Sequence, residues 1–279
     1  KLILIDGHSI LNRAFYGVPD LTNAEGIHTN ALYGFLNILF KFLDEEKPDY
    51  ITVAFDLSAP TFRHKAFDGY KGTRKPMQPE LKQQVPLMKE LLKAMNITVV
   101  EQEGYEADDI LGTLAKQNAN KGIDVSIISG DRDLLQLADE HIKIRIPKTK
   151  KGVTEVEDYY PADVFDLYGV TPHEFIDVKA LMGDASDNIP GVAGVGEKTA
   201  MSLIQNYKNI DYIYEHIDEL EIKDGVRNKL KNDRDNAYLS YELATIDRNA
   251  PIEFDFSAAV RGGYNESELA ALFTRLNFR

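Results

Sequence analysis

The sequence predicts an α/β protein in which an open, mostly parallel sheet precedes a second, mostly helical region. Three short apolar runs rich in β-branched residues end in acids: LILID at Asp6, YITVAFD at Asp56, and DVSIISGDRD at Asp131 and Asp133. Runs of this length and composition are typical of buried parallel strands. Because helical patterns separate them, the alternation indicates an open α/β sheet, whose ligands bind beyond the carboxyl ends of the strands.

The helices between the strands follow from apolar residues that recur every three or four positions. One helix is expected over residues 32–43, a second over 85–95, and a third beginning near Glu106. Each presents one apolar face to the predicted sheet.

The strand pattern fades from about Pro161 onwards. Helical patterns then cover residues 165–181, 199–207 and 226–243. We therefore divide the chain into a sheet-containing region, residues 1–162, and a helical region, residues 163–279. No internal repeat or low-complexity segment interrupts either region.

Composition narrows the function classes. The 279 residues are 43% hydrophobic, enough for a sizeable core, and include no cysteine. Disulfide frameworks, thiolate zinc sites and cysteine nucleophiles are therefore excluded, and a reducing compartment fits. No apolar run approaches the length that crosses a bilayer, so no membrane association is expected, and a cytoplasmic monomer is the default. The chain begins at Lys1 rather than methionine, so we expect a longer parent protein.

Nine acidic residues stand out because they follow strands or begin helices in five separate segments. They are Asp6, Asp56, Glu106, Asp108, Asp109, Asp131, Asp133, Asp184 and Asp187. Carboxylates brought together repel one another unless bound cations compensate their charge. Oxygen ligands without cysteine or clustered histidine favour Mg²⁺ or Mn²⁺. Two such ions roughly 3.5–4 Å apart would stabilise the attacking and leaving oxygens in phosphodiester hydrolysis.

Any one of these acids alone is as well explained by a helix cap or a solvated turn. The joint pattern favours ligands, because Glu106 and Asp109 lie one helical turn apart and Asp184 and Asp187 repeat the spacing. Neither DRDLLQ, residues 131–136, nor DASDNIPG, residues 184–191, matches the pattern of a calcium-binding EF-hand loop. Without the nine, 36 acids face 32 bases, so much of the formal charge of −13 belongs to this set and an anionic partner is not excluded.

A basic run with interleaved aromatic residues follows the second predicted strand. Across residues 63–75 only Asp68 opposes its cations, which alternate with aromatic rings: Arg63, Lys65, Phe67, Tyr70, Lys71, Arg74 and Lys75. Such a run suits a single nucleic-acid strand, although an exposed loop kept soluble by charge is the alternative. For a second basic run, residues 143–151, we prefer the solvated hairpin or loop.

A glycine-rich turn precedes the predicted helix at residues 199–207. It departs from a P-loop, because Glu197 stands in place of the lysine, and from the dinucleotide-binding pattern, because Thr199 stands in place of the last glycine. A tight helical hairpin remains, and its backbone N–H groups can bind one phosphate of a duplex. The expected DNA-binding residues here are Gly191, Gly194, Gly196, Lys198 and Thr199. A plain turn between helices is the alternative.

Taken together, these motifs resemble the 5′ nuclease domain at the N-terminus of bacterial DNA polymerase I, within the flap endonuclease family. The likeness runs through LILIDGHS, AFDLSAPTFRH, GYKGTR, GYEADDILGTLA, SGDRDLLQL and LMGDASDNIPGVAGVGEKTA. It implies a PIN-like (Rossmann-like) core over residues 1–162 with a helical arch at about 57–86. Residues 163–279 would hold a helix-3-turn-helix region that binds duplex DNA, followed by C-terminal helices.

The resemblance also implies roles for individual residues. A first metal site would use Asp6, Asp56, Glu106, Asp108 and Asp109, and a second Asp131, Asp133, Asp184 and Asp187. Tyr70, Lys71 and Arg74 match arch residues that contact the substrate, with Lys71 and Arg74 near the scissile phosphate. The arch run would add Arg63 and Lys65 as DNA contacts. The glycine hairpin would hold a potassium ion through backbone carbonyls.

The resulting hypothesis is a DNA 5′ nuclease that uses two or more Mg²⁺ ions, with Mn²⁺ as the alternative cation, and has 5′-3′ exonuclease and 5′-flap endonuclease activity. Its substrate would be a flapped, nicked or branched duplex with a 5′ single strand, and its role primer and flap removal near the nucleoid. A polymerase domain would follow in the parent chain. One alternative is a catalytically silent DNA-structure binding module, which the nine acids disfavour. Another is a PIN-type RNA nuclease, which the helical half with its glycine hairpin disfavours.

Overall fold

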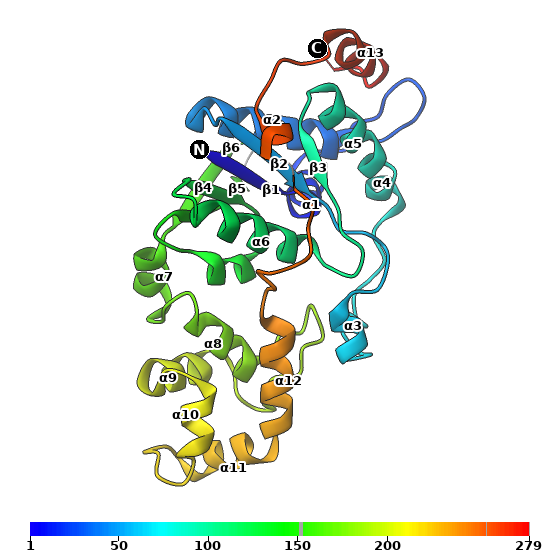
Figure 1. Ribbon diagram of the computed structural model, residues 1–279. Coiled ribbons are helices and arrows are strands. Elements are labelled where there is room, and N and C mark those ends of the chain that lie inside the picture. The colour runs from blue at the N-terminus through cyan, green and yellow to red at the C-terminus, as the bar shows by residue number, and fades with distance from the viewer. Residues whose placement is uncertain (151–152, 255, 279) are drawn as a thin grey trace.

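A six-stranded sheet forms the centre of the computed structural model, which describes residues 1–150, 153–254 and 256–278 (Figure 1). The strand order is β3-β2-β1-β4-β5-β6. In chain order the strands are β1 (Leu2–Asp6), β2 (Tyr50–Ala54), β3 (Thr98–Val100), β4 (Val125–Ile128), β5 (Ile142–Lys150) and β6 (Val153–Tyr159). All neighbours pair in parallel except β5 and β6. The predicted open, mostly parallel sheet is confirmed.

The strand order reverses at β1. β2 and β3 extend the sheet on one side of it and β4 on the other, so Ile3 pairs with both Ile51 and Ser126. In open α/β sheets this reversal leaves a crevice at the carboxyl ends of the strands. Asp6 ends β1, and Asp56 and Asp131 follow β2 and β4 at that edge.

Helices cover both faces of the sheet. Packed on one face are α1 (Gly7–Gly17), α2 (Asn30–Glu46) and α5 (Gln84–Ala94), and on the other α6 (Ala107–Ala119) and α7 (Pro161–Tyr168). Successive strand residues point to opposite faces, so Ile3 joins the first core and Leu4 the second. The two phenylalanines of α2, Phe35 and Phe42, are fully buried. The helices expected over 32–43, over 85–95 and from Glu106 correspond to α2, α5 and α6.

The expected arch, residues 57–86, contains two short helices, α3 (Phe62–Ala66) and α4 (Pro79–Lys82), joined by turns. A 3₁₀ helix, η1 (Arg132–Leu137), follows β4. The second basic run lies largely in β5, which forms an antiparallel hairpin with β6 as preferred; Lys151 lies outside the described residues.

The helical region has its own core. It comprises α8 (Glu174–Met182), α9 (Glu197–Tyr207), α10 (Ile210–Glu215), α11 (Asp224–Asn232) and α12 (Arg234–Ala244). The pattern predicted over 165–181 divides into α7 and α8, because Gly169 adopts φ +70° and ends α7. The pattern over 226–243 divides at Asp233 into α11 and α12.

The C-terminal residues return to the sheet (Figure 1). Ile246 joins the core beneath α6, and η2 (Phe256–Ala259) lies beside β2. Leu269 of α13 (Glu266–Arg275) packs into the core that includes α2 and α5. In space, residues 246–254 and 256–278 therefore lie with the sheet rather than with the helices before them, because Ile246, Ala259 and Leu269 are buried against it. Among the described residues, no helix is long and apolar enough to cross a membrane.

Candidate metal centre and active site

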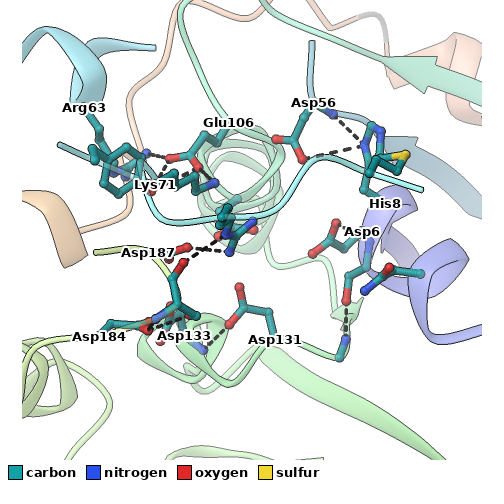
Figure 2. Close-up of a pocket in the computed structure, with 18 of the residues that line it drawn as sticks. Asp6, His8, Asp56, Arg63, Lys71, Glu106, Asp131, Asp133, Asp184 and Asp187 are labelled. Carbon is teal, nitrogen blue, oxygen red and sulfur yellow. Dashed lines mark hydrogen bonds and ion pairs between the residues drawn. The ribbon is translucent and has the colours of Figure 1, made fainter. Parts of the chain in front are cut away.

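A cavity of about 970 Å³ opens at the carboxyl edge of the sheet. Eight of the nine predicted carboxylates line it: Asp6, Asp56, Glu106, Asp108, Asp131, Asp133, Asp184 and Asp187. Figure 2 shows the labelled acids facing a common space from both sides. They arrive from β1, from the loop after β2, from the start of α6, from the segment after β4, and from the loop after α8. The fold thus brings five distant segments to one site.

Three of these acids also cap helices. Asp6 Oδ1 accepts the Ser9 N–H of α1 at 3.4 Å, and Asp131 Oδ1 accepts the Asp133 N–H of η1 at 2.8 Å. Glu106 is the N-cap residue of α6. A cap uses one lone pair of a carboxylate, so capping fixes the side chain and leaves other lone pairs for further partners; Asp6 Oδ2, for example, accepts the Ser129 hydroxyl at 2.8 Å. The cap and ligand interpretations therefore do not exclude one another.

Asp6, Asp108 and Asp131 crowd one side of the cavity. Burial and then the charge of Asp56 raise the pKa of Asp6 to about 7. Burial and then Asp133 raise the pKa of Asp131 to about 8, and burial with Asp131 and Asp6 raises that of Asp108. An all-oxygen donor set whose ionisation is this unfavourable fits hard divalent cations, which stabilise the charged form.

These pKa values predict a metal-sensitive pH dependence of stability. Because the pKa values of Asp6 and Asp131 exceed the ordinary 3.8, the folded chain binds more protons than the unfolded chain between about pH 4 and 8. The free energy of unfolding should therefore fall as pH rises through that window in EDTA. Mg²⁺ should reduce the fall, because a cation that binds the ionised site stabilises the folded state. Urea denaturation at several pH values measures both effects.

Asp177 provides the control for this experiment. It is buried in the helical region outside the cavity, and burial raises its pKa to about 7. Its contribution to the pH dependence should persist in Mg²⁺ and disappear in Asp177→Asn. Identical pH slopes with and without Mg²⁺ would contradict cation binding at the cavity.

A second group lies across the cavity. One carboxylate oxygen from each of Asp133, Asp184 and Asp187 lies within 4.8 Å of the others. Asp184 is fixed through its Oδ1, which accepts the Ser186 N–H at 2.9 Å. Lys179 of α8 also reaches this group, with its Nζ 3.1 Å from Asp133 Oδ1. Sequence reasoning missed Lys179, because a single lysine within a helix carries no distinguishing pattern.

The arch residues reach the carboxylates directly. Lys71 forms an ion pair with Glu106 through its Nζ, and Arg74 forms one with Asp187. The Tyr70 hydroxyl donates to Glu106 Oε2 at 3.0 Å. Figure 2 shows Arg63 and Lys71 beside Glu106. Burial opposes ionisation of Glu106, but Lys71 and Arg63 offset it and lower its pKa. Cations predicted to contact phosphate thus lie beside the predicted metal ligands.

The structure corrects the predictions for Arg63 and Asp109. Arg63 is only 3% exposed, and its NH1 and NH2 donate to Asp109 Oδ2 and Oδ1 at 2.8 and 2.9 Å. Its Nε donates to Leu243 O at 2.9 Å, and it also pairs with Glu106. Arg63 lines the cavity but is held in this buried network rather than exposed on the arch, and Asp109 does not line the cavity. Lys65, by contrast, is exposed as expected.

Replacing Arg63 by methionine should strongly destabilise the fold. Removing one partner of a buried ion pair leaves the other charge uncompensated, at a cost of roughly 3–5 kcal/mol. The free energy of unfolding from urea titration measures the loss. Lys65→Met, an exposed neighbour in α3, should change stability little; equal losses in both variants would contradict the structural role of Arg63.

The glycine hairpin between α8 and α9 requires its glycines. Gly191 and Gly194 adopt φ +61° and +80°. The Gly191 N–H donates to Ser240 Oγ of α12 at 2.8 Å, and the Ala193 N–H donates to Asp233 Oδ2 at 2.7 Å. The hairpin is therefore anchored from α12. Gly196 precedes α9 as its N-cap residue, and in that helix Lys198 is exposed and Thr199 half-buried.

Gly191→Ala should disrupt the hairpin. A Cβ at this position would lie 2.4 Å from Gly183 N, and φ +61° would be strained for alanine. We expect a lower thermal midpoint and weaker binding to duplex DNA, measured by calorimetry and fluorescence anisotropy. Gly196→Ala is the matched control, since a Cβ there meets nothing within 4 Å. A Gly191→Ala protein as stable as this control would contradict the constraint.

Comparison with known proteins agrees with this architecture. Residues 1–169 match the family model "5′-3′ exonuclease, N-terminal resolvase-like domain", and residues 170–267 match "5′-3′ exonuclease, C-terminal SAM fold". The whole chain is 49% identical over 278 residues to DNA polymerase I of Bacillus subtilis and 44% identical over 280 residues to that of Caldicellulosiruptor bescii. It spans 31% and 33% of those proteins, about a third of their length.

Solved structures share the fold at lower identity. A T5 5′-exonuclease with bound divalent zinc ions superposes with a TM-score of 0.71 at 21% identity, covering 99% of this chain and 98% of that one. A bacteriophage T5 flap endonuclease in a pseudo-enzyme-product complex with DNA and metal ions gives 0.73 at 20% identity, covering 99% of both. With both family models matched in order along its length, the chain belongs to the 5′-3′ exonuclease family.

Proposed function

We propose that this chain is a structure-specific DNA 5′ nuclease that acts as a 5′-3′ exonuclease and a 5′-flap endonuclease. The observation that carries the proposal is the convergence of eight carboxylates from five segments on one cavity. Binding alone does not need such charge crowding, whereas phosphodiester hydrolysis assisted by cations does. This argues against a catalytically silent binding module.

We assign the cavity carboxylates to two cation positions. The family resemblance assigns Asp131 to the second set and Asp109 to the first. Because Asp131 lies near Asp6 and Asp108, and Asp109 pairs with Arg63, we propose instead that Asp6, Asp108 and Asp131 would hold one divalent ion, with Asp56 and Glu106 beside them, and that Asp133, Asp184 and Asp187 would hold a second. Bound Mg²⁺, or Mn²⁺ in its place, supplies Lewis-acid stabilisation and a more acidic water. Oxygen-only donors support these hard ions over zinc.

The arch cations would orient the substrate. Lys71 and Arg74 lie at the cavity, paired with Glu106 and Asp187. When divalent ions neutralise those carboxylates, a phosphate can become the partner of both cations. Tyr70 is buried beneath this turn, so its role is to position Lys71 and Glu106 rather than to stack on a base.

Duplex DNA would bind the helical region below the cavity. The glycine hairpin offers backbone N–H groups at the start of α9, and exposed Lys198 adds charge. Backbone carbonyls of the hairpin would bind the expected potassium ion. Lys65 would contact the 5′ strand at the arch. This arrangement supports DNA with a duplex portion over the RNA substrate of a minimal PIN nuclease.

The relatives suggest the biological setting. They carry the name DNA polymerase I and are about three times as long as this chain. We therefore propose a polymerase domain in the same parent protein and a role in removing primers and flaps during replication and repair, in the cytoplasm at the nucleoid.

The test is cleavage of a 5′-labelled flap duplex, with a matched single strand and an RNA-flap version, in Mg²⁺ or EDTA. We expect Mg²⁺-dependent cuts near the junction of the DNA flap and little cleavage of the single strand. Tight flap binding without cleavage in Mg²⁺ or Mn²⁺ would favour the silent binding module. Preference for the RNA-flap substrate would favour an RNA nuclease.

A further inference from the structure

Two cations reach the second carboxylate group: Arg74 of the arch pairs with Asp187, and Lys179 lies between Asp133 and Asp184. Lys179, in α8, places its Nζ 3.1 Å from Asp133 Oδ1 and 3.6 Å from Asp184 Oδ2. Its side chain is 17% exposed and lines the cavity. The protein thus supplies its own counter-ion here.

The first carboxylate group has no such counter-ion. Within residues 1–150, 153–254 and 256–278, no lysine or arginine forms an ion pair with Asp6, Asp108 or Asp131. A divalent ion entering the first group therefore meets carboxylates that no ammonium or guanidinium contacts directly, whereas Lys71, Arg74 and Lys179 act on them only from a longer distance. An ion entering the second group must approach oxygens that an ammonium already contacts, and the two cations repel.

We propose that Lys179 is a positioning residue that sets the order in which divalent ions bind, by keeping the affinity of the second carboxylate group low. The first group fills first. The second group fills when further negative charge arrives, as the phosphate of a bound substrate would supply. The flexible lysine stem lets the ammonium move aside at that moment without unfolding α8. This inference rests on the proposed function, because it concerns the cations of that site.

The test is Mn²⁺ binding to the DNA-free protein, followed by electron paramagnetic resonance of the unbound ion. We expect a strong and a weak class of sites in the wild type. Lys179→Met should tighten the weak class roughly ten-fold or more, since a like charge next to the ion is removed, and leave the strong class unchanged. Lys179→Gln gives the same comparison with a polar chain. Thermal unfolding verifies the fold of each variant.

Two controls separate local charge from net charge. Lys179→Arg keeps the cation and should retain the wild-type weak class. Lys231, on α11, forms an exposed ion pair with Asp218. Lys231→Met removes this charge and should also leave the Mn²⁺ affinity of the weak class unchanged. An unchanged or weaker second class in folded Lys179→Met and Lys179→Gln would overturn this inference alone. Absence of any Mn²⁺ binding by the wild type would overturn the proposed function, and this inference with it.

Discussion

Replacing Asp184 by asparagine is expected to slow cleavage of a 5′-flap duplex by roughly a hundred-fold to a thousand-fold, as loss of a group that stabilises transition-state charge typically does. Asparagine keeps the Oδ1 that accepts the Ser186 N–H at 2.9 Å, so the loop should hold its shape. It replaces Oδ2, which lies 3.6 Å from Lys179 Nζ, with an amide NH2 group, and the side chain loses its negative charge. The amide nitrogen is a poor ligand for Mg²⁺, which prefers oxygen. Single-turnover cleavage measures the loss.

DNA affinity should change far less, because Asp184 contributes a cation ligand rather than a phosphate contact. Anisotropy with a flap duplex in Ca²⁺ measures binding without relying on turnover. Asp218→Asn is the control, since this carboxylate is exposed and pairs only on the surface with Lys231. Equal losses of binding and cleavage in Asp184→Asn would contradict the assignment.

Lys71→Ala is expected to reduce the rate of cleavage by about a hundred-fold, the typical effect of removing one preorganised charge beside a reacting phosphate. Lys71 adopts φ +57°, and alanine carries the same Cβ, so the backbone strain is unchanged. Glu106 retains Arg63 and Tyr70 as partners, so the buried cluster should survive. Single-turnover rates with saturating enzyme separate this loss from weaker binding.

Lys65→Ala is the matched control in the same arch. Lys65 is exposed on α3, whereas Lys71 points to Glu106 in the cavity. Lys65→Ala should weaken binding and lower its salt dependence while sparing the saturated rate, as expected for a phosphate contact away from the reaction. Wild-type cleavage by Lys71→Ala, or equal effects of both variants, would exclude a role for Lys71 near the scissile phosphate.

The meeting of acids at the strand ends could be predicted from the sequence, because parallel strands bring their carboxyl ends to one edge of the sheet. Asp6, Asp56 and Asp131 were identified in this way, and the reversal of strand order beside β1 explains why they meet. Asp184 and Asp187 lie in a loop of the other region. Their contribution to the cavity could be expected only from their spacing and the family resemblance.

Side-chain direction could not be predicted. Asp108 and Asp109 are consecutive in α6, so they point about 100° apart around the helix, and only Asp108 lines the cavity. Asp109 instead pairs with Arg63, whose Nε donates to the backbone carbonyl of Leu243, 180 residues later in the chain. The position of Lys179 at the cavity could not be predicted either, because it too depends on side-chain direction. Its function depends on Asp133, from another region of the fold.

The most direct test of the central claim is a crystal structure with Mn²⁺ and a nicked or flapped DNA product, using anomalous scattering to locate the ions. We expect two Mn²⁺ ions in the cavity, one among Asp6, Asp108 and Asp131 and the other among Asp133, Asp184 and Asp187. We also expect that Lys71 leaves Glu106 for a phosphate. A cavity without ordered Mn²⁺, or ions bound only elsewhere on the protein, would contradict the account.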